Sequence, residues 1–397
     1  MKERYILFLI LGLDALILFL QIPGLSISRY EASLLYGDYS FLQSIIEKSI
    51  YLFGQNDFAL RAPMIIFHLL SALLLYNISM KYTKSQRDRL WLILIFILLP
   101  GVISSAIIVD SAGLLIFGLL FFIYMYENYS KQYIYFLLIA YLFVDYNFLY
   151  LFLALCLFSI YAKQKYFLIF NILLLIGSIF LYGLNMHGSP KGHFLDAIGI
   201  YAAIFTPIIF IYLFYILYRR YLTKEIDLLW FISATAMLVS LLLSFRQKIE
   251  IEHFAPYIMM ALPLGAETFS HSYRVRLKIF RNKYKTIFIV SLFFLFLNSF
   301  LVFFNKELYL IIENPKKHFA YKMHVAKELA SQLKSKGITC VKTNNNMSRR
   351  LKFYGVTKCN TYILSEKQFK QNKNYDVTIS YKKRPVYFAD VTKVNTQ

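Results

Sequence analysis

Two carboxylates stand at the mouths of apolar stretches, where they could exchange a proton with a substrate hydroxyl. Glu31 follows the first apolar stretch, and Asp110 interrupts an otherwise apolar or small run from Val102 to Tyr124. Charged side chains at membrane depth are costly and usually functional. Each has a plainer interpretation: Glu31 as a solvated loop acid, and Asp110 as the N-cap of the next helix. One residue can fill both roles.

Basic side chains in a later loop could bind an anionic head group. Arg246, Lys248 and His253 lie in the loop before the predicted span 254–270, and Arg246 follows directly on an apolar helix. Arg contacts a phosphate through two parallel hydrogen bonds, and Lys acts as a point charge. The alternative is a set of surface salt bridges that join Arg246 or Lys248 to Glu250 or Glu252.

The loop of residues 184–197 is rich in Gly, Pro and polar side chains, which favours an ordered, non-helical excursion. Lys191 in this loop could contact a phosphate. His187 and His193 could ligate a metal, although their spacing matches no metal-binding motif. An ordinary interfacial loop is the alternative.

The elements that must position these residues are apolar helices. The chain has 397 residues, of which 58% are hydrophobic and 16% are charged, whereas soluble domains carry about 25% charged residues. The hydropathy predicts a polytopic α-helical membrane protein with about 11 transmembrane helices and argues against most soluble enzymes. The predicted spans are residues 4–22, 60–79, 90–108, 111–126, 133–144, 148–161, 166–183, 198–218, 228–244, 254–270 and 286–304.

Lys and Arg gather in the loops that follow the even-numbered spans, and they also flank the N-terminus. Such loops face the cytoplasm, so the N-terminus is predicted to be cytoplasmic. The outer segments would then be 23–59, 109–110, 145–147, 184–197, 245–253 and the tail after 304. Apolar residues recur at helical spacing in the long first outer loop, 23–59, which predicts interfacial helices there.

The tail is predicted to form a small C-terminal α/β domain, so that the chain divides into domains 1–304 and 305–397. The expected helices are Ala326–Lys336 and Met347–Tyr354, and the expected strands are Ile338–Lys342, Thr361–Leu364, Tyr375–Tyr381 and Val386–Val391. Cys340 and Cys359 could form a disulfide if the tail lies outside the cytosol. Two unpaired thiols are the alternative.

In their order along the chain, these features resemble the GT-C superfamily of membrane glycosyltransferases that use polyprenyl-phosphate-linked sugars. The protein O-mannosyltransferase and lipid A aminoarabinose transferase group (glycosyltransferase family 39-like) is the most similar branch. The resemblance rests on Tyr30-Glu31-Ala32, Arg61-Ala62-Pro63, Asp110 and the segment from His253 to Pro263. Tyr30 stands where the family usually has Asp, and His253 stands where it often has Arg, so Glu31 would have to replace the missing Asp.

The resemblance implies inverting transfer of a sugar from a polyprenyl-phosphate donor to a cell-envelope acceptor, at the outer face of the inner membrane. Glu31 or Asp110 would deprotonate or orient the acceptor. The donor phosphate would be bound by Arg61, Lys191, Arg246, Lys248 and His253. The acceptor would be a glycolipid such as lipopolysaccharide, or a protein. No cofactor is required, although a divalent metal is compatible with the chemistry. The other partners would be membrane lipids, and no nucleic acid is expected.

Two other functions fit the same pattern. The chain could be a transporter or flippase of a lipid-linked substrate, which charges inside several spans would favour. It could also be a catalytically inactive family member that acts as a scaffold, an interpretation that the missing Asp supports. Charges are scarce within the spans and polar residues gather at one face, which favours the enzyme.

Overall fold

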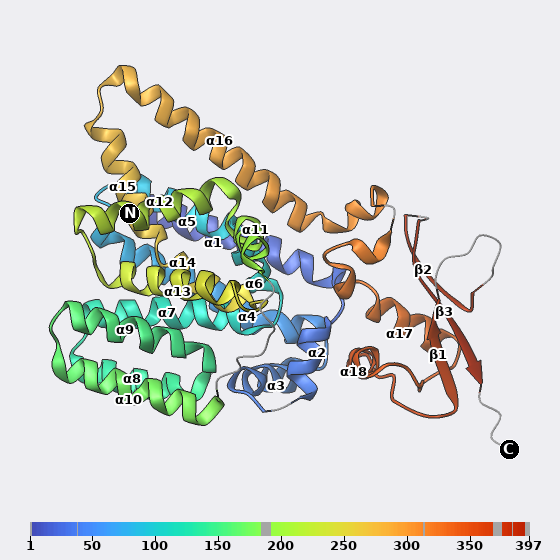
Figure 1. Cartoon of the computed structure of the whole chain (residues 1–397). Helices are drawn as coiled ribbons and strands as arrows, with labels where there is room; N and C mark the ends of the chain where they lie inside the picture. Colours follow the sequence, from blue (N-terminus) through green and yellow to red (C-terminus); the bar gives the residue numbers. More distant parts are fainter. Residues whose placement is uncertain are drawn as a thin grey trace. The chain divides into compact units, whose positions relative to one another are not determined.

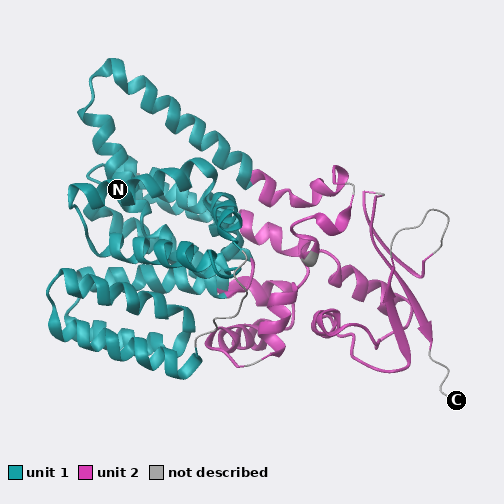
Figure 2. Ribbon diagram, in the orientation of Figure 1, with its two compact units in different colours: residues 1–16, 64–107, 111–299 teal, residues 17–63, 108–110, 300–397 magenta. Residues whose placement is uncertain are grey.

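The computed structural model describes residues 2–37, 39–183, 192–312, 314–367, 375–382 and 384–393, and most of them are helical (Figure 1). The chain divides into two compact units (Figure 2). Unit 1 contains residues 1–16, 64–107 and 111–299, and unit 2 contains residues 17–63, 108–110 and 300–397. Each unit therefore gathers segments that lie far apart in the sequence.

Unit 1 is a bundle of helices. Its elements are α1 (Lys2–Gln21), α4 (Asp57–Tyr82), α5 (Gln86–Leu98), α6 (Pro100–Ile107), α7 (Ser111–Asn128), α8 (Lys131–Val144), η2 (Tyr146–Phe148), α9 (Leu149–Tyr161), α10 (Lys165–Tyr182), α11 (Phe194–Phe205), α12 (Pro207–Thr223), α13 (Leu228–Ser244), η3 (Ile251–His253), α14 (Ala255–Met259), α15 (Leu262–Val275) and α16 (Lys278–Phe303). The first residues of α4 and the ends of α1 and α16 belong to unit 2.

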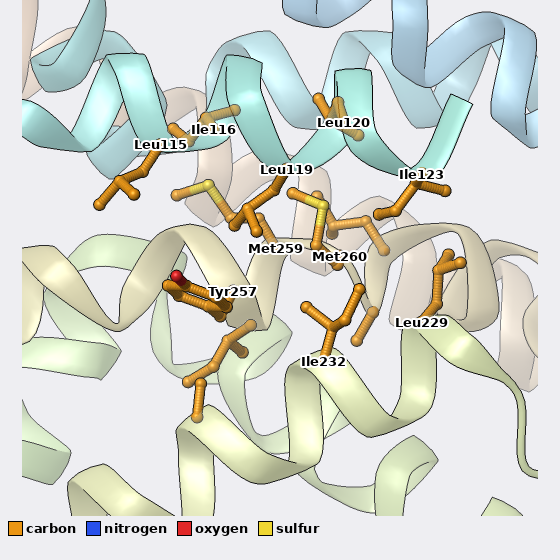
Figure 3. Packing of buried hydrophobic residues seen from close by; sticks show 14 of the residues in the cluster. Leu115, Ile116, Leu119, Leu120, Ile123, Leu229, Ile232, Tyr257, Met259 and Met260 are labelled. Atoms are coloured by element: carbon orange, nitrogen blue, oxygen red, sulfur yellow. The ribbon is translucent and has the colours of Figure 1, made fainter. Parts of the chain in front are cut away.

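The centre of the bundle is closely packed. Leu119 of α7 lies between Ile116 and Leu120, and all three side chains are buried (Figure 3). Ile232 of α13 and Met260, the residue that follows α14, belong to the same buried cluster. Residues spaced three and four apart on α7 thus form one continuous apolar face, as helical periodicity requires.

Among the described residues, five helices are long and apolar enough to cross a membrane, or seven if two bent pairs each count as one span. The pairs α5 with α6 and α11 with α12 bend by 62° and 106°. Pro100 and Pro207 stand at the breaks, because proline cannot donate the hydrogen bond that would continue a helix. The predicted count of eleven is not confirmed: α8, α9 and α13 are shorter apolar helices, and the predicted span 254–270 is divided into α14 and α15.

The loops of unit 1 contact one another in two separate sets. Next to the basic loops, ion pairs between helices join Lys81 with Glu127, Arg220 with Glu267 and Arg274 with Asp88. The polar loops before α7, before α9 and before α14 meet through Ser111, Asn147 and His253. The first set contains loops that the charge distribution predicts to be cytoplasmic, and the second set contains loops predicted to lie on the outer side.

An acid–imidazole pair joins two apolar helices inside unit 1. The Asp14 carboxylate of α1 lies 2.6 Å from Nε2 of His68 on α4, and both side chains are buried. On the same face of α1, Leu7 and Leu11 are buried as well. The sequence analysis overlooked this pair, although a charge within an apolar span is itself a signal of a specific partner.

Unit 2 combines the first long loop with the C-terminal tail. It contains η1 (Ile22–Gly24), α2 (Arg29–Tyr36), α3 (Phe41–Phe53), the start of α4, η4 (Asn305–Leu310), η5 (Pro315–Lys317), η6 (Tyr321–Met323), α17 (Ala326–Ser335), α18 (Asn345–Phe353), β1 (Tyr362–Glu366), β2 (Val377–Tyr381) and β3 (Arg384–Lys393). The strands form one antiparallel sheet in the order β1-β3-β2. Leu329 and Leu333 of α17 share a buried core with Ile379 of β2.

The predicted secondary structure of the tail is largely confirmed. The two helices and three of the four strands form within a few residues of their predicted bounds. The fourth predicted strand, Ile338–Lys342, forms only two isolated bridges, Cys340 with Thr357 and Lys342 with Ile363. Cys340 and Cys359 are joined by a disulfide, whereas Cys156 is a buried free thiol. The predicted first-loop helices are α2 and α3, and α3 exposes Tyr51 and Phe53.

Candidate functional site

Glu31 stabilises the N-terminus of α2. The Ser28 hydroxyl accepts a hydrogen bond from the backbone N–H of Glu31 at 3.1 Å. The Glu31 carboxylate in turn accepts one from the backbone N–H of Ser28 at 2.6 Å. This reciprocal capping box satisfies two of the donors that a helix start leaves unpaired. The sequence around residue 28 therefore fixes the direction of the Glu31 side chain.

The Glu31 carboxylate also joins two other segments of unit 2. Its Oε2 accepts a hydrogen bond from Nη2 of Arg61 at 3.2 Å, and its Oε1 accepts one from the backbone N–H of Val109 at 3.1 Å. Both the Glu31 and the Arg61 side chains have 0% of their surface exposed. Glu31 is thus a buried junction between α2, the start of α4 and the segment 108–110, rather than a solvated loop acid.

Arg61 is held by backbone and side-chain oxygens. Its Nη2 also donates to the carbonyl of Ser26 at 3.1 Å, and its Nη1 lies 3.7 Å from the Asp57 carboxylate. Within the described part of the chain, Nε and Nη1 have no hydrogen-bond partner. A buried guanidinium with unused donors retains capacity for a further acceptor.

Asp57 connects the start of α4 to the tail. Its Oδ1 accepts a hydrogen bond from the Tyr354 hydroxyl at 2.7 Å, and its Oδ2 accepts one from Lys327 at 2.7 Å. The Tyr354 oxygen also accepts a hydrogen bond from the backbone N–H of Ile27 at 2.8 Å. Tyr354 therefore joins the tail to the residues that precede α2.

Arg350 of α18 is a second buried guanidinium in this network. It donates from Nε to the carbonyl of Ile27 at 2.8 Å and from Nη2 to the Ser26 hydroxyl at 3.3 Å. Burial lowers the pKa of Arg350, and the nearby Glu31 carboxylate opposes that shift. Buried charges need partners of opposite sign: Glu31 and Asp57 both pair with Arg61, and the Glu31 charge also favours the charged form of Arg350.

Asp110 directly precedes α7 and is half-buried. Its backbone N–H donates to the carbonyl of Ile108 at 3.1 Å, so the chain turns tightly there. Since Glu31 binds the N–H of Val109, the two carboxylate residues predicted from the sequence are brought into one small region of unit 2. Asp110 is more accessible than the fully buried Glu31.

The other predicted site residues belong to unit 1 or lie outside the described residues. Arg246 and Lys248 are exposed, and neither makes an ion pair within the described ranges. Glu250 instead pairs with His253, whose Nε2 lies 2.9 Å from the carboxylate. Lys191 and His187 lie outside the described residues. No group of three or more metal-ligating side chains occurs in the part of the chain that the structure describes.

Sequence reasoning missed most of the network around Glu31. Arg350 and Tyr354 lie on a short basic helix that resembles a solvated face, and nothing in the local pattern indicates that they are buried. Asp57 carried a weak signal, since it stands at the start of an apolar span four residues before Arg61.

The comparisons with known proteins give information about the fold. No family model and no curated protein matches the chain. Among solved structures, the chain is similar to "Crystal Structure of ArnT from Cupriavidus metallidurans in the apo state". The TM-score is 0.56 at 11% sequence identity, and the match covers 90% of this chain and 85% of that chain. The chain therefore shares the fold of that structure over most of its length.

Proposed function

We propose that this chain is an integral-membrane glycosyltransferase that moves a sugar from a polyprenyl-phosphate donor to a cell-envelope acceptor, with inversion at the anomeric carbon. The observation that carries the proposal is the junction of Glu31, Arg61 and the segment next to Asp110. Of the four motifs that carry the resemblance, two contact one another through Glu31 and Arg61, and Glu31 also binds the residue before Asp110, which is the third. The shared fold with ArnT supports the same class of enzyme.

In the proposed reaction, the acceptor oxygen attacks the anomeric carbon and the bond from that carbon to the phosphate oxygen breaks. The bonding electrons leave with the polyprenyl phosphate, and the proton of the acceptor hydroxyl passes to a carboxylate. We assign that proton transfer to Asp110, because the buried oxygens of Glu31 already accept three hydrogen bonds. Glu31 is then a positioning residue that fixes the backbone beside Asp110.

A departing phosphate needs positive charge where its own negative charge develops. Arg61, Lys191, Arg246, Lys248 and His253 keep the donor-phosphate role predicted from the sequence. For Arg61 the role is supported by its two nitrogens without a hydrogen-bond partner in the described residues. Polyprenyl phosphate is a stable leaving group, so the mechanism requires no metal.

The proposed membrane topology has independent support. Unit 2 consists of residues 17–63, 108–110 and 300–397, which are chiefly segments that the charge distribution predicts to lie on the outer side. The Cys340–Cys359 disulfide in the tail fits an oxidising compartment, because cytosolic thiols are kept reduced. We therefore propose an inner-membrane protein with a cytoplasmic N-terminus and an extracytoplasmic C-terminal region.

The proposal is tested with purified protein and a radiolabelled pool of polyprenyl-phosphate sugars from bacterial membranes, in the presence of a cell-envelope glycolipid extract. Wild type should transfer label to the extract, and Asp110→Asn should lower that rate by about 100-fold or more. If wild type instead moves the intact labelled lipid across vesicle bilayers without cleaving it, the protein is a flippase and the proposal is wrong. If wild type shows neither activity, only the scaffold interpretation remains.

A further inference from the structure

A second polar cluster lies in unit 1 and uses none of the residues around Glu31. It forms where the start of α7, the junction of α8 with η2, and η3 come together. Nδ2 of Asn147 donates to the Ser111 hydroxyl at 3.4 Å, and that hydroxyl lies 3.2 Å from Nδ1 of His253. The Tyr257 hydroxyl donates to the Asn147 carbonyl at 2.6 Å and fixes the loop against α14.

Asp145 is oriented within this cluster by its neighbour. Oδ1 of Asp145 accepts hydrogen bonds from both the backbone N–H and Nδ2 of Asn147, each at 2.8 Å. The two hydrogen bonds that Asp145 accepts from described residues both reach Oδ1, and none reaches Oδ2. The side chain is half-buried, and burial raises the pKa of Asp145. Burial removes part of the water that would otherwise solvate this carboxylate. A ligand that donates a hydrogen bond to Oδ2 would compensate for that loss.

Asn147 is itself an unusual buried amide. The residue has 0% of its surface exposed, yet its Oδ1 has no hydrogen-bond partner among the described residues. A buried amide oxygen without a donor costs free energy unless a ligand or water supplies one. The loop thus holds two acceptor oxygens, one on Asp145 and one on Asn147, that the protein does not use.

Exposed aromatic rings border these acceptors. The Tyr146 side chain is 43% exposed, and its ring centroid lies 5.6 Å from that of His253 and 6.4 Å from that of Tyr182. Tyr182 is 42% exposed. Aromatic faces offer apolar contact together with a polar edge. A carboxylate and an amide with free acceptors, beside exposed rings, match the alternating hydroxyl groups and C–H faces of a sugar ring.

We propose that Asp145 and Asn147, bordered by Tyr146 and His253, bind the hydroxyl groups of a sugar ring, with Oδ2 of Asp145 as the principal acceptor. The proposal deepens the proposed function and rests on it for the source of the sugar, which is either the lipid-linked donor or a glycan acceptor. The same hydroxyl chemistry serves both sources, and the experiment distinguishes them.

Asp145→Asn is the sharpest variant, because an amide oxygen can still accept both hydrogen bonds from Asn147 while the open oxygen becomes a donor. Asp227→Asn is a matched control: Asp227 caps α13 by accepting from the Trp230 backbone N–H, and its other oxygen accepts from Tyr82. Both variants should fold. Asp145→Asn should raise KM for one substrate by about tenfold or more, as loss of a charged hydrogen bond predicts, and should leave kcat within about twofold, whereas Asp227→Asn should change neither.

Binding is measured separately from turnover by hydrogen–deuterium exchange of the full chain at residues 144–150. Three probes are compared: the polyprenyl-phosphate-sugar pool, polyprenyl phosphate alone, and the glycolipid extract. Protection by the sugar-bearing pool alone, lost in Asp145→Asn, would support a donor-sugar site; protection by the extract alone would support an acceptor site. Protection equal to that from polyprenyl phosphate alone, or no protection while wild type transfers sugar, would overturn the sugar site but not the enzyme. Sugar-dependent protection without transfer would support the sugar site and refute the proposed enzyme. If wild type shows no protection and no transfer, both the site and the enzyme are refuted.

Discussion

Oε1 of Glu31 accepts a hydrogen bond at 3.1 Å from the backbone N–H of Val109, the residue before Asp110. The same carboxylate caps α2 and contacts Arg61. One buried acid thus ties the first long loop to the short turn before α7. The position of Asp110 depends on Glu31 through the backbone, so removal of either residue should impair the proposed transfer, but for different reasons.

Replacement of Glu31 by Gln should destabilise unit 2 as well as impair transfer. A neutral amide removes the closer of the two carboxylates that pair with the buried Arg61 and leaves only Asp57 at 3.7 Å, and the NH₂ of the amide must face a donor. Loss of one partner of a buried pair typically costs about 3 kcal/mol or more. Thermal unfolding in detergent measures the loss. Glu47→Gln on the exposed face of α3 is the control, and equal melting temperatures for both variants would contradict the network described here.

Replacement of Tyr354 by Phe should loosen the tail from the first loop. The change removes one hydroxyl that donates to Asp57 and accepts from the Ile27 backbone N–H. Two buried groups lose a partner, so the expected cost is about 2 kcal/mol. Faster hydrogen exchange at residues 25–36 would reveal it. Tyr362→Phe should leave that exchange unchanged, and a Tyr354→Phe variant indistinguishable from wild type would refute the link.

Acid should destabilise the tail through His324. This side chain is buried against Tyr309, and burial, with Lys306 and His318 nearby, lowers its pKa to about 3. The unfolded chain therefore binds a proton that the folded chain excludes as pH falls below about 6.5, so stability is full above that pH and is lost progressively toward about pH 3. His324→Gln should flatten the decline, whereas the exposed His271→Gln should not. An unchanged profile in His324→Gln would contradict the assignment.

The Cys340–Cys359 disulfide should stabilise the tail and report its compartment. It closes a loop with a sequence separation of 19, and loops of this size contribute about 3 kcal/mol. Alkylation of denatured, unreduced protein taken from membranes should modify Cys156 and leave the other two cysteines unmodified. Alkylation of all three would place the tail in a reducing compartment and would contradict the proposed orientation.

The sequence predicted the membrane class, the first-loop helices and most of the tail, because those features follow from local periodicity and turn residues. The order of motifs in the chain also indicated Glu31, Arg61 and Asp110 as site residues, and their roles remain predictions. It did not predict that Arg350 and Tyr354 are buried against residues 26 and 27, since such contacts depend on tertiary packing between segments more than 290 residues apart. The number of spans was not confirmed, because α8, α9 and α13 are shorter than a typical membrane span and the predicted span 254–270 is divided into α14 and α15.

The most direct test is a single-turnover experiment with purified protein and a polyprenyl-phosphate sugar pool labelled in both the sugar and the phosphate, with the glycolipid extract as acceptor. Wild type should convert the donor to polyprenyl phosphate and a labelled glycolipid in equal amounts. Asp110→Asn should bind the donor with unchanged affinity, but its rate of conversion should be lower by about 100-fold or more. Equal conversion by wild type and Asp110→Asn would refute the role of Asp110. If wild type converts no donor, the proposal that this protein is a glycosyltransferase is wrong.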